Sequence, residues 1–232
     1  MKAIVLCAGL GTRLRPLTDR IPKVMIEIGG EPLLLRQLRL LRHAGVTQVA
    51  MNLHHLGDAI RAAVGDGSAL GIEAVYADEP ELRGSAGALR GFPGFFDQRF
   101  FVVYGDVYHE IDLGELASFH NARRGDMTIA TAPADDPTRC GVLRIAPDAR
   151  IEAFVEKPSS APPDAPTNTG VYVCEPKIAA MIPPGVSDFG GDVIPSLIAS
   201  GENLYAFSAS AVVQDIGTPQ GLERARRLAS RT

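Results

Sequence analysis

The chain opens with a short apolar segment that runs directly into a glycine-rich, cationic turn. Residues 2–7 (KAIVLC) have the length and character of a buried strand, and residues 8–18 (AGLGTRLRPLT) follow at once. Glycines after a strand let the backbone approach a ligand closely and point its N–H groups toward it. Because Arg13, Arg15 and Lys23 add positive charge to the same region, the segment predicts a site for a polyanion such as a triphosphate.

The spacing of this turn excludes two common phosphate loops. The chain has no GxxxxGK[ST] motif, and Leu14 stands where the third glycine of a GxGxxG motif would be. A dinucleotide-dependent oxidoreductase would also need an acidic residue at the end of the second strand, where the sequence has Asn52, Leu53 and His54. We therefore reject that class of enzyme.

Net charge and cysteine content limit the classes of partner and the cellular compartment that we expect. The net charge of −4 indicates no general affinity for nucleic acid or anionic membranes. The three cysteines (Cys7, Cys140 and Cys174) are widely spaced, which predicts free thiols and neither disulfides nor a zinc site. With a strand at the start of the chain and no apolar run of membrane length, we expect a cytoplasmic protein.

Hydrophobic periodicity predicts an α/β fold in a single domain spanning residues 1–232. In the first half, predicted strands at 46–53, 72–77 and 99–104 alternate with helices at 32–44 and 58–64, which indicates parallel pairing. In the second half, short strands at 127–132, 141–146 and 150–155 are separated by prolines, which indicates hairpins. We predict a Rossmann-like, three-layer α/β/α domain whose mostly parallel mixed sheet carries a small antiparallel extension.

Several polar residues follow the predicted strands. Asp106 comes after the apolar strand 99–104, a position suited to a Mg²⁺ ligand in an open α/β sheet. The small residues 84–88 (GSAGA) are expected to begin a helix with free N–H groups facing a ligand. Lys157 and Asn168 flank a proline-rich loop, whereas His54 and His55 are interpreted as loop residues because no third metal ligand accompanies them.

Seven motifs follow one another along the chain. They are GLGTRLRPLT (9–18), PK (22–23), the stretch 79–89, YGD (104–106), EKP (156–158), NTG (168–170) and DIGTP (215–219). In content and order they resemble the signature of the sugar-1-phosphate nucleotidyltransferases, which make nucleotide-sugars from a nucleoside triphosphate and a sugar 1-phosphate. The resemblance covers most of the chain.

The resemblance implies a role for each matching residue. Arg13 and Lys23 would act at the reacting phosphates, and Asp106 and Asp215 would hold a catalytic Mg²⁺. The residues implied to bind the nucleotide are Ala8, Gly9, Gly11, Thr12, Arg13, Glu79, Gly84, Ser85 and Ala86. Those implied to bind the sugar phosphate are Gly105, Glu156, Lys157 and Asn168. The implied partners are thus a nucleoside triphosphate and a sugar 1-phosphate, bound by a monomer or homodimer.

The motifs alone do not specify the nucleotide base or the sugar. The compact length and the GSAGAL stretch (84–89) are similar to those of short guanylyltransferases and also to those of uridylyltransferases in this family. Our first choice is guanylyl transfer to a mannose- or heptose-type sugar 1-phosphate; the alternatives are uridylyl transfer to a glucose- or N-acetylmuramate-type substrate, or a non-catalytic nucleotide-sensing relative. The chain departs from the family pattern in having no tryptophan, and Gln214 precedes Asp215. Because it ends soon after the DIGTP motif, we expect no C-terminal β-helix domain.

Overall fold

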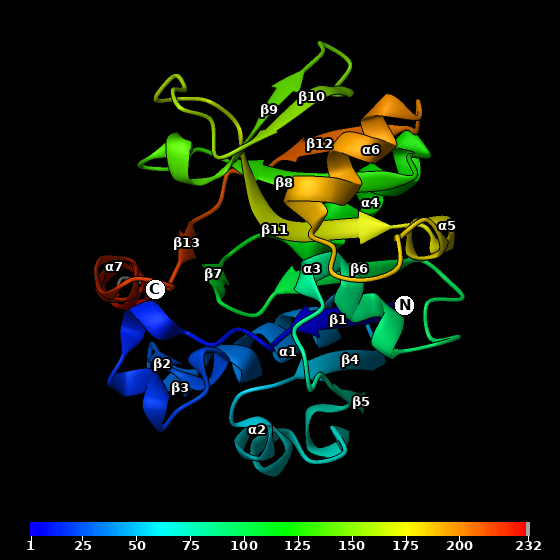
Figure 1. Ribbon diagram of the computed structural model, residues 1–232. Coiled ribbons are helices and arrows are strands. Elements are labelled where there is room, and N and C mark those ends of the chain that lie inside the picture. Colours follow the sequence, from blue (N-terminus) through cyan, green and yellow to red (C-terminus); the bar gives the residue numbers. More distant parts are fainter. Residues whose placement is uncertain (231–232) are drawn as a thin grey trace.

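The computed structural model describes residues 1–230, and within them the core of the fold is a nine-stranded sheet (Figure 1). Seven strands lie in the order β10 (Ile151–Glu156), β9 (Gly141–Ile145), β11 (Thr167–Cys174), β6 (Phe100–Tyr104), β1 (Lys2–Leu6), β4 (Gln48–Leu53) and β5 (Glu73–Asp78). The other two are β8 (Met127–Ala132), which pairs with β11, and β12 (Leu204–Ser208), which pairs with β8.

The strand directions divide the sheet into two regions. Strands β6, β1, β4 and β5 are parallel, so that Lys2 lies opposite both Gln48 and Phe100. Strand β11 runs antiparallel to β6, β8 and β9, and β9 and β10 form an antiparallel hairpin, while β12 returns parallel to β8. The predicted fold class is therefore confirmed.

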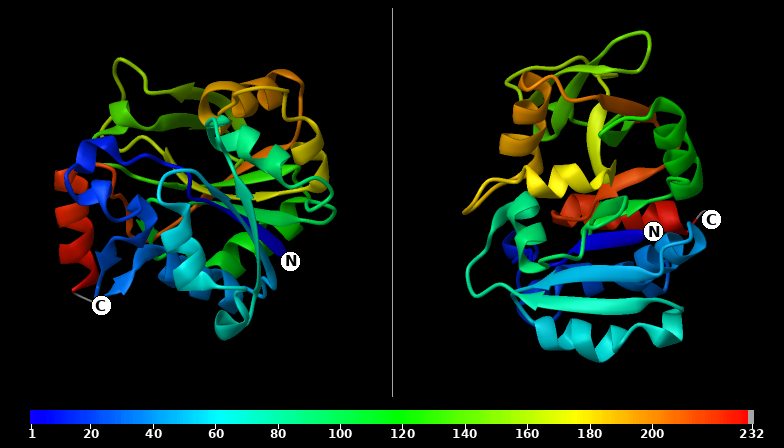
Figure 2. Two further views of the ribbon diagram at one scale, coloured as in Figure 1. Left: turned by 60° about the horizontal axis from the view of Figure 1, so that its bottom comes forward. Right: turned by 90° about the vertical axis from the view of Figure 1, so that its right-hand side faces the viewer.

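Helices cover both faces of the sheet because alternate strand residues point to opposite sides (Figure 2). Ala3 and Val5 of β1 belong to a core cluster with α1 (Leu33–His43), α2 (Gly57–Val64) and α4 (Leu113–Arg123). Ile4 belongs to the opposite cluster with α3 (Gly84–Gly87), α5 (Pro176–Ala180) and α6 (Ile194–Ala199). This division produces the three predicted layers.

A third, smaller core joins the two ends of the chain. It contains Leu14, Ile26, Ile28, Leu33, Tyr108, Ile216, Leu222 and Ala225. The elements around it are the hairpin β2 (Glu27–Ile28) and β3 (Glu31–Pro32), the pair β7 (Val107–His109) and β13 (Val213–Asp215), and helix α7 (Pro219–Ala229). Figure 1 shows α7 beside the β2–β3 hairpin, so the late segment of the chain lies next to its first loop.

Most element positions agree with the sequence prediction, including the start of α7. Thr218 caps this helix by accepting a hydrogen bond from the Gly221 N–H at 3.1 Å, and Pro219 occupies its first position. The sequence did not predict β2, β3, β7 or α5. These elements span only two to five residues, too short for a periodic pattern to identify.

Candidate functional site

A pocket of about 210 Å³ opens where the parallel strands β1, β4 and β6 end. This is the edge of an open α/β sheet at which ligands bind. The lining residues are Leu6, Ala8, Gly9, Lys23, Val24, Asn52, Glu79, Leu82, Gly84, Ser85, Tyr104 and Asp106. The pocket thus combines glycine-rich backbone, one cation and two carboxylates with an apolar floor.

The glycine-rich loop is folded against a buried threonine. Gly11 has a left-handed φ of +63°, and a Cβ placed on it would lie 2.7 Å from Cγ2 of Thr18. The Thr18 hydroxyl donates to the Gly11 carbonyl at 2.8 Å. Only glycine fits this close approach without displacing Thr18. Ala8 and Gly9 line the pocket, whereas Gly11 and Thr12 shape the loop behind it.

Lys23 is the central cation of the site. Its side chain is 8% exposed, and its ammonium contacts Oδ2 of Asp106 and lies 3.9 Å from Oδ1 of Asp215. The pairing of β7 with β13 places Asp215 opposite Val107, and the Ile216 N–H donates to the Asp106 carbonyl at 3.0 Å. Two carboxylates that are 109 positions apart in the sequence therefore meet at one lysine.

Arg13 approaches the same point, as Gly217 shows. A Cβ placed on Gly217 would lie 2.8 Å from Oδ1 of Asp215, 2.8 Å from Nζ of Lys23 and 3.0 Å from Nη2 of Arg13. Any larger residue at position 217 would displace these groups. Gly217 is a residue to which the sequence assigned no separate role, and the convergence of charged side chains explains it.

The two carboxylates differ in their surroundings. Partial burial and the nearby Asp106 carboxylate raise the pKa of Asp215, while Lys23, the Gly217 N–H and Arg13 oppose that shift. The Asp106 side chain is 32% exposed and that of Asp215 is 60% exposed, so oxygens of both reach solvent. A pair of accessible carboxylates beside a phosphate loop fits Mg²⁺, which takes one or two carboxylates together with phosphate oxygens and water. Residues 1–230 contain no cluster of three His, Cys, Asp or Glu side chains that would form an all-protein metal site.

Asn52 and Glu79 form one wall of the pocket. Glu79 is buried, and its carboxylate accepts hydrogen bonds from Asn52 Nδ2 at 3.1 Å and from the Arg83 N–H at 3.2 Å. The side-chain oxygen Oδ1 of Asn52 accepts from the Cys7 N–H at 2.9 Å. Asn52 therefore joins the end of β1 to Glu79.

Sequence reasoning assigned no ligand role to Asn52, Leu82 or Tyr104, although all three line the pocket. Asn52 and Tyr104 lie at the ends of predicted parallel strands. Their position at a strand end, where parallel strands present side chains to one crevice, was the signal available in the sequence.

The start of α3 differs from expectation. The N–H of Ser85 donates to Asp188 Oδ1 at 2.8 Å, and the N–H of Ala86 donates to the Ser187 carbonyl at 2.9 Å. The prediction of free N–H groups at this helix start is therefore wrong, because the segment leading to α6 already uses them. Gly84 and Ser85 line the pocket, whereas Ala86 is fully buried behind it.

None of the residues implied for the sugar phosphate lines this pocket, although Gly105 stands between two residues that do, Tyr104 and Asp106. The Lys157 side chain is 66% exposed and its ammonium lies 3.2 Å from Oε1 of Glu156. The Asn168 amide accepts from the Gly170 N–H at 3.0 Å and donates to the Tyr172 hydroxyl at 2.8 Å. The Gly105 N–H donates to the Leu6 carbonyl at 3.0 Å, next to Asp106.

Comparison with known proteins identifies relatives over nearly the whole chain. The family model described as nucleotidyl transferase matches residues 2–231. A UTP–glucose-1-phosphate uridylyltransferase of Synechocystis sp. is 36% identical, with 94% of this chain and 60% of the relative covered. A mannose-1-phosphate guanylyltransferase of Mycobacterium tuberculosis is 34% identical, with 96% and 62% covered. The chain thus spans about 60% of the length of these curated relatives.

Solved structures of similar fold also cover nearly the whole chain. A structure from Bacillus anthracis, assigned as a glucose-1-phosphate thymidylyltransferase and complexed with a sucrose, superposes with a TM-score of 0.90 at 25% identity and covers 100% of this chain and 96% of that one. HddC from Yersinia pseudotuberculosis, complexed with GMP-PN, superposes with a TM-score of 0.79 at 28% identity and 98% coverage of both chains.

In residues 1–230, no helix has both the length and the apolar character needed to cross a membrane.

Proposed function

The chain belongs to the nucleotidyl transferase family, and from this premise we propose that it transfers a nucleoside monophosphate from a nucleoside triphosphate to a sugar 1-phosphate, with release of pyrophosphate. The observation that supports this activity best is the cluster of Lys23, Asp106 and Asp215 at a glycine-lined pocket. Both substrates are anions that repel each other. A site of this kind lowers that repulsion by placing cationic groups where the phosphates meet.

The proposed reaction is an in-line displacement at phosphorus. An oxygen of the sugar 1-phosphate forms a bond to the α-phosphorus, the bond from that phosphorus to the bridging oxygen breaks, and the electron pair leaves with pyrophosphate. A phosphate monoester dianion is already nucleophilic, so no protein nucleophile is needed. Positioning and electrostatic stabilisation by Arg13 and Lys23 then supply the catalysis.

Asp106 and Asp215 would hold a Mg²⁺ ion in this proposal. The ion would neutralise phosphate charge beside the carboxylates. Lys23 would keep the two carboxylates together and would also contact the phosphates. The carboxylates fit this role because both side chains are partly exposed, while the β7–β13 pairing and the bond from the Ile216 N–H to the Asp106 carbonyl fix the backbone beside them.

Different parts of the molecule would hold the two substrates. We assign the nucleoside to the wall formed by Asn52, Glu79 and Ser85, and the triphosphate to the loop from Ala8 to Arg13. We assign the sugar phosphate to Gly105, Glu156, Lys157 and Asn168. The hydrogen bonds that fix the Asn168 amide leave one of its N–H protons for a ligand.

Guanylyl transfer to a mannose- or heptose-type sugar 1-phosphate is our first choice of substrates. The guanylyltransferase relative and the GMP-PN complex of HddC support it. Uridylyl transfer to a glucose-type sugar is the second choice, because the Synechocystis relative with 36% identity is a uridylyltransferase. Both choices place the base in the same pocket, where it would meet the same hydrogen-bond donors and acceptors.

A substrate panel tests the proposal. Purified protein would be incubated with each of four nucleoside triphosphates and several sugar 1-phosphates, with Mg²⁺ present, and pyrophosphate release would be measured. We expect the fastest release with GTP and mannose 1-phosphate, and loss of release on addition of a chelator. If a triphosphate binds but no pair releases pyrophosphate, the transferase assignment is wrong and the nucleotide-sensing alternative replaces it.

A further inference from the structure

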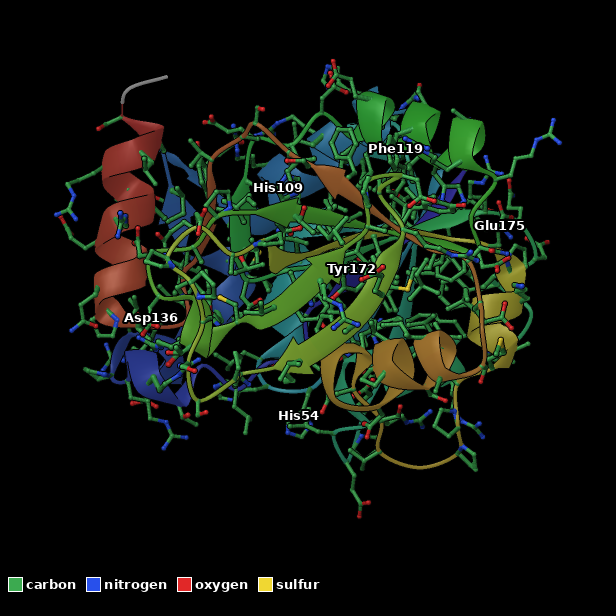
Figure 3. The ribbon with its side chains drawn as sticks, turned by 90° about the horizontal axis from the view of Figure 1, so that it is seen from above. His54, His109, Phe119, Asp136, Tyr172 and Glu175 are labelled. Atoms are coloured by element: carbon green, nitrogen blue, oxygen red, sulfur yellow. The ribbon has the colours of Figure 1, made fainter. Side chains whose placement is uncertain are left out.

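Residues 52–55 comprise the last two residues of β4 and the two histidines after it, and their side chains bond to three segments at or near the pocket. Asn52 bonds to the end of β1 and to Glu79. His54 and His55 bond to the backbone carbonyls of Glu79, which lines the pocket, and of Thr18, which lies behind the glycine-rich loop against Gly11. In the view of Figure 3, His54 and His109 lie well apart from each other.

His54 fixes the backbone of Glu79. Its Nδ1 lies 2.6 Å from the Glu79 carbonyl oxygen. A carbonyl oxygen only accepts, so Nδ1 must carry the proton in this bond. The Glu79 N–H in turn donates to the Leu53 carbonyl at 2.7 Å. Glu79 is thus held through both its backbone N–H and its backbone carbonyl, and its carboxylate is held separately by Asn52.

His55 fixes the glycine-rich loop from the other side. Its Nε2 lies 2.9 Å from the carbonyl oxygen of Thr18, so that this nitrogen is the donor. Thr18 lies in a short 3₁₀ helix at Leu17–Asp19 and is 1% exposed. The same residue clamps Gly11 through its hydroxyl. His55 is therefore linked to the backbone of the phosphate loop through a single residue.

We propose that His54 and His55 are positioning residues, with His55 holding the glycine-rich loop in its phosphate-binding shape through Thr18 and His54 holding Glu79 against the nucleoside. The assignment rests on the proposed nucleotidyl transfer. One ring nitrogen of each histidine bonds to a backbone carbonyl, and the two carbonyls belong to different segments of the chain. His55 would thus act on the triphosphate part of the bound nucleotide and His54 on its nucleoside part.

The two histidines should fail in different ways when truncated. His55→Ala releases the 3₁₀ helix and loosens the loop that carries Arg13, so we expect KM for the triphosphate to rise about tenfold and kcat to fall, with KM for the sugar 1-phosphate unchanged. His54→Ala frees Glu79, so we expect the preference for the best base over the others to fall about tenfold. Neither effect should spread to the sugar phosphate.

Conservative variants separate positioning from general loosening. A glutamine amide reaches about as far as Nε2 of histidine, and an asparagine amide about as far as Nδ1. We therefore expect His55→Gln to recover most of the triphosphate KM and His55→Asn not to. The pattern should be reversed at position 54, where His54→Asn recovers base preference and His54→Gln does not. His43→Ala serves as the control, since Nδ1 of that exposed histidine bonds only within its own helix, to the Arg39 carbonyl at 2.7 Å.

Triphosphate binding measured by calorimetry keeps the inference independent of turnover. If no sugar 1-phosphate is a substrate but His55→Ala weakens binding of the triphosphate and His55→Gln restores it, the positioning role stands and the proposed reaction fails. The positioning role is wrong if glutamine and asparagine behave alike at both positions. It is equally wrong if the alanine variants change KM for both substrates to the same extent.

Discussion

The two lysines implied to contact phosphate sit in opposite kinds of surroundings. Lys23 is 8% exposed and is held by Asp106 and Asp215. Lys157 is 66% exposed, has a left-handed φ of 46°, and lies beside the carboxylate of its neighbour Glu156. One cation is therefore fixed before any ligand arrives, and the other is largely solvated at the end of β10.

This difference teaches how one site treats its two anions. A buried lysine is tolerable because paired carboxylates compensate for its lost hydration, and its fixed position makes it suited to stabilise charge that develops during reaction. An exposed lysine contributes little until a ligand orders it, since solvent and salt screen it. We accordingly expect the Lys23 side to control the rate and the Lys157 side to control substrate affinity.

Lys23→Met should give the largest effect. It keeps the aliphatic stem but removes the ammonium from the reacting phosphates, so we expect kcat to fall by about a hundredfold or more. Pyrophosphate release under saturating substrate measures this, and thermal unfolding checks that the variant is folded. A kcat within twofold of the natural protein would remove Lys23 from the catalytic role and break the contrast between the lysines.

Asp106→Asn should come next. The amide keeps the size of the carboxylate but loses the charge that holds a cation, so we expect kcat/KM to fall by about a hundredfold and the Mg²⁺ concentration needed for half-maximal activity to rise. The matched variant Asp215→Asn should have a smaller effect, because that carboxylate is 60% exposed against 32% for Asp106. Unchanged Mg²⁺-dependence in both variants would contradict the assignment of the metal.

The sequence was informative where the chemistry is local. The parallel strands are continuous apolar runs, and the cations beside the glycines of the first loop are adjacent to one another in the chain. Strand-end positions likewise identified Asp106. These features follow from periodicity and turn chemistry within short windows, so a single sequence carries them.

What could not be predicted depends on contacts between distant segments. Asp188, more than a hundred positions away, accepts from the Ser85 N–H at 2.8 Å, and the Ser187 carbonyl accepts from the Ala86 N–H at 2.9 Å. These contacts occupy N–H groups that were expected to face a ligand. The role of Asn52 arises only when β1, β4 and β5 lie side by side. Strand β7, with three residues, has too few positions to show alternation.

Lys157→Met should have a more moderate effect on the opposite side of the comparison. An exposed charge contributes to ground-state binding, so we expect KM for the sugar 1-phosphate to rise about tenfold while kcat changes little. The natural protein should show the same KM rising with ionic strength, and the variant should show a weaker salt dependence. A large fall in kcat with an unchanged KM would assign Lys157 to the transition state and make the two lysines alike.

The region around Lys23 should also lose stability in acid, whereas the region around Lys157 should not. His109 of β7 tests this, and its expected effect is the smallest. His109 is 1% exposed, and neither ring nitrogen has a hydrogen-bond partner in the described part of the chain. Burial, with a contribution from the nearby Arg36, lowers the pKa of His109 to about 4 from its ordinary 6.5. The unfolded chain therefore binds a proton at a higher pH than the folded chain does.

As the pH falls from 7 to 5, this difference should remove about 2 kcal/mol from the free energy of unfolding, and the loss should end near pH 4, where the folded state takes up the proton as well. His109→Phe, which keeps a planar ring but cannot be protonated, should lose about 2 kcal/mol less over the same interval. Urea unfolding at both pH values measures the difference, with His43→Ala as the exposed control. An equal loss of stability in the natural protein and in His109→Phe would show that the acid sensitivity arises elsewhere than at His109.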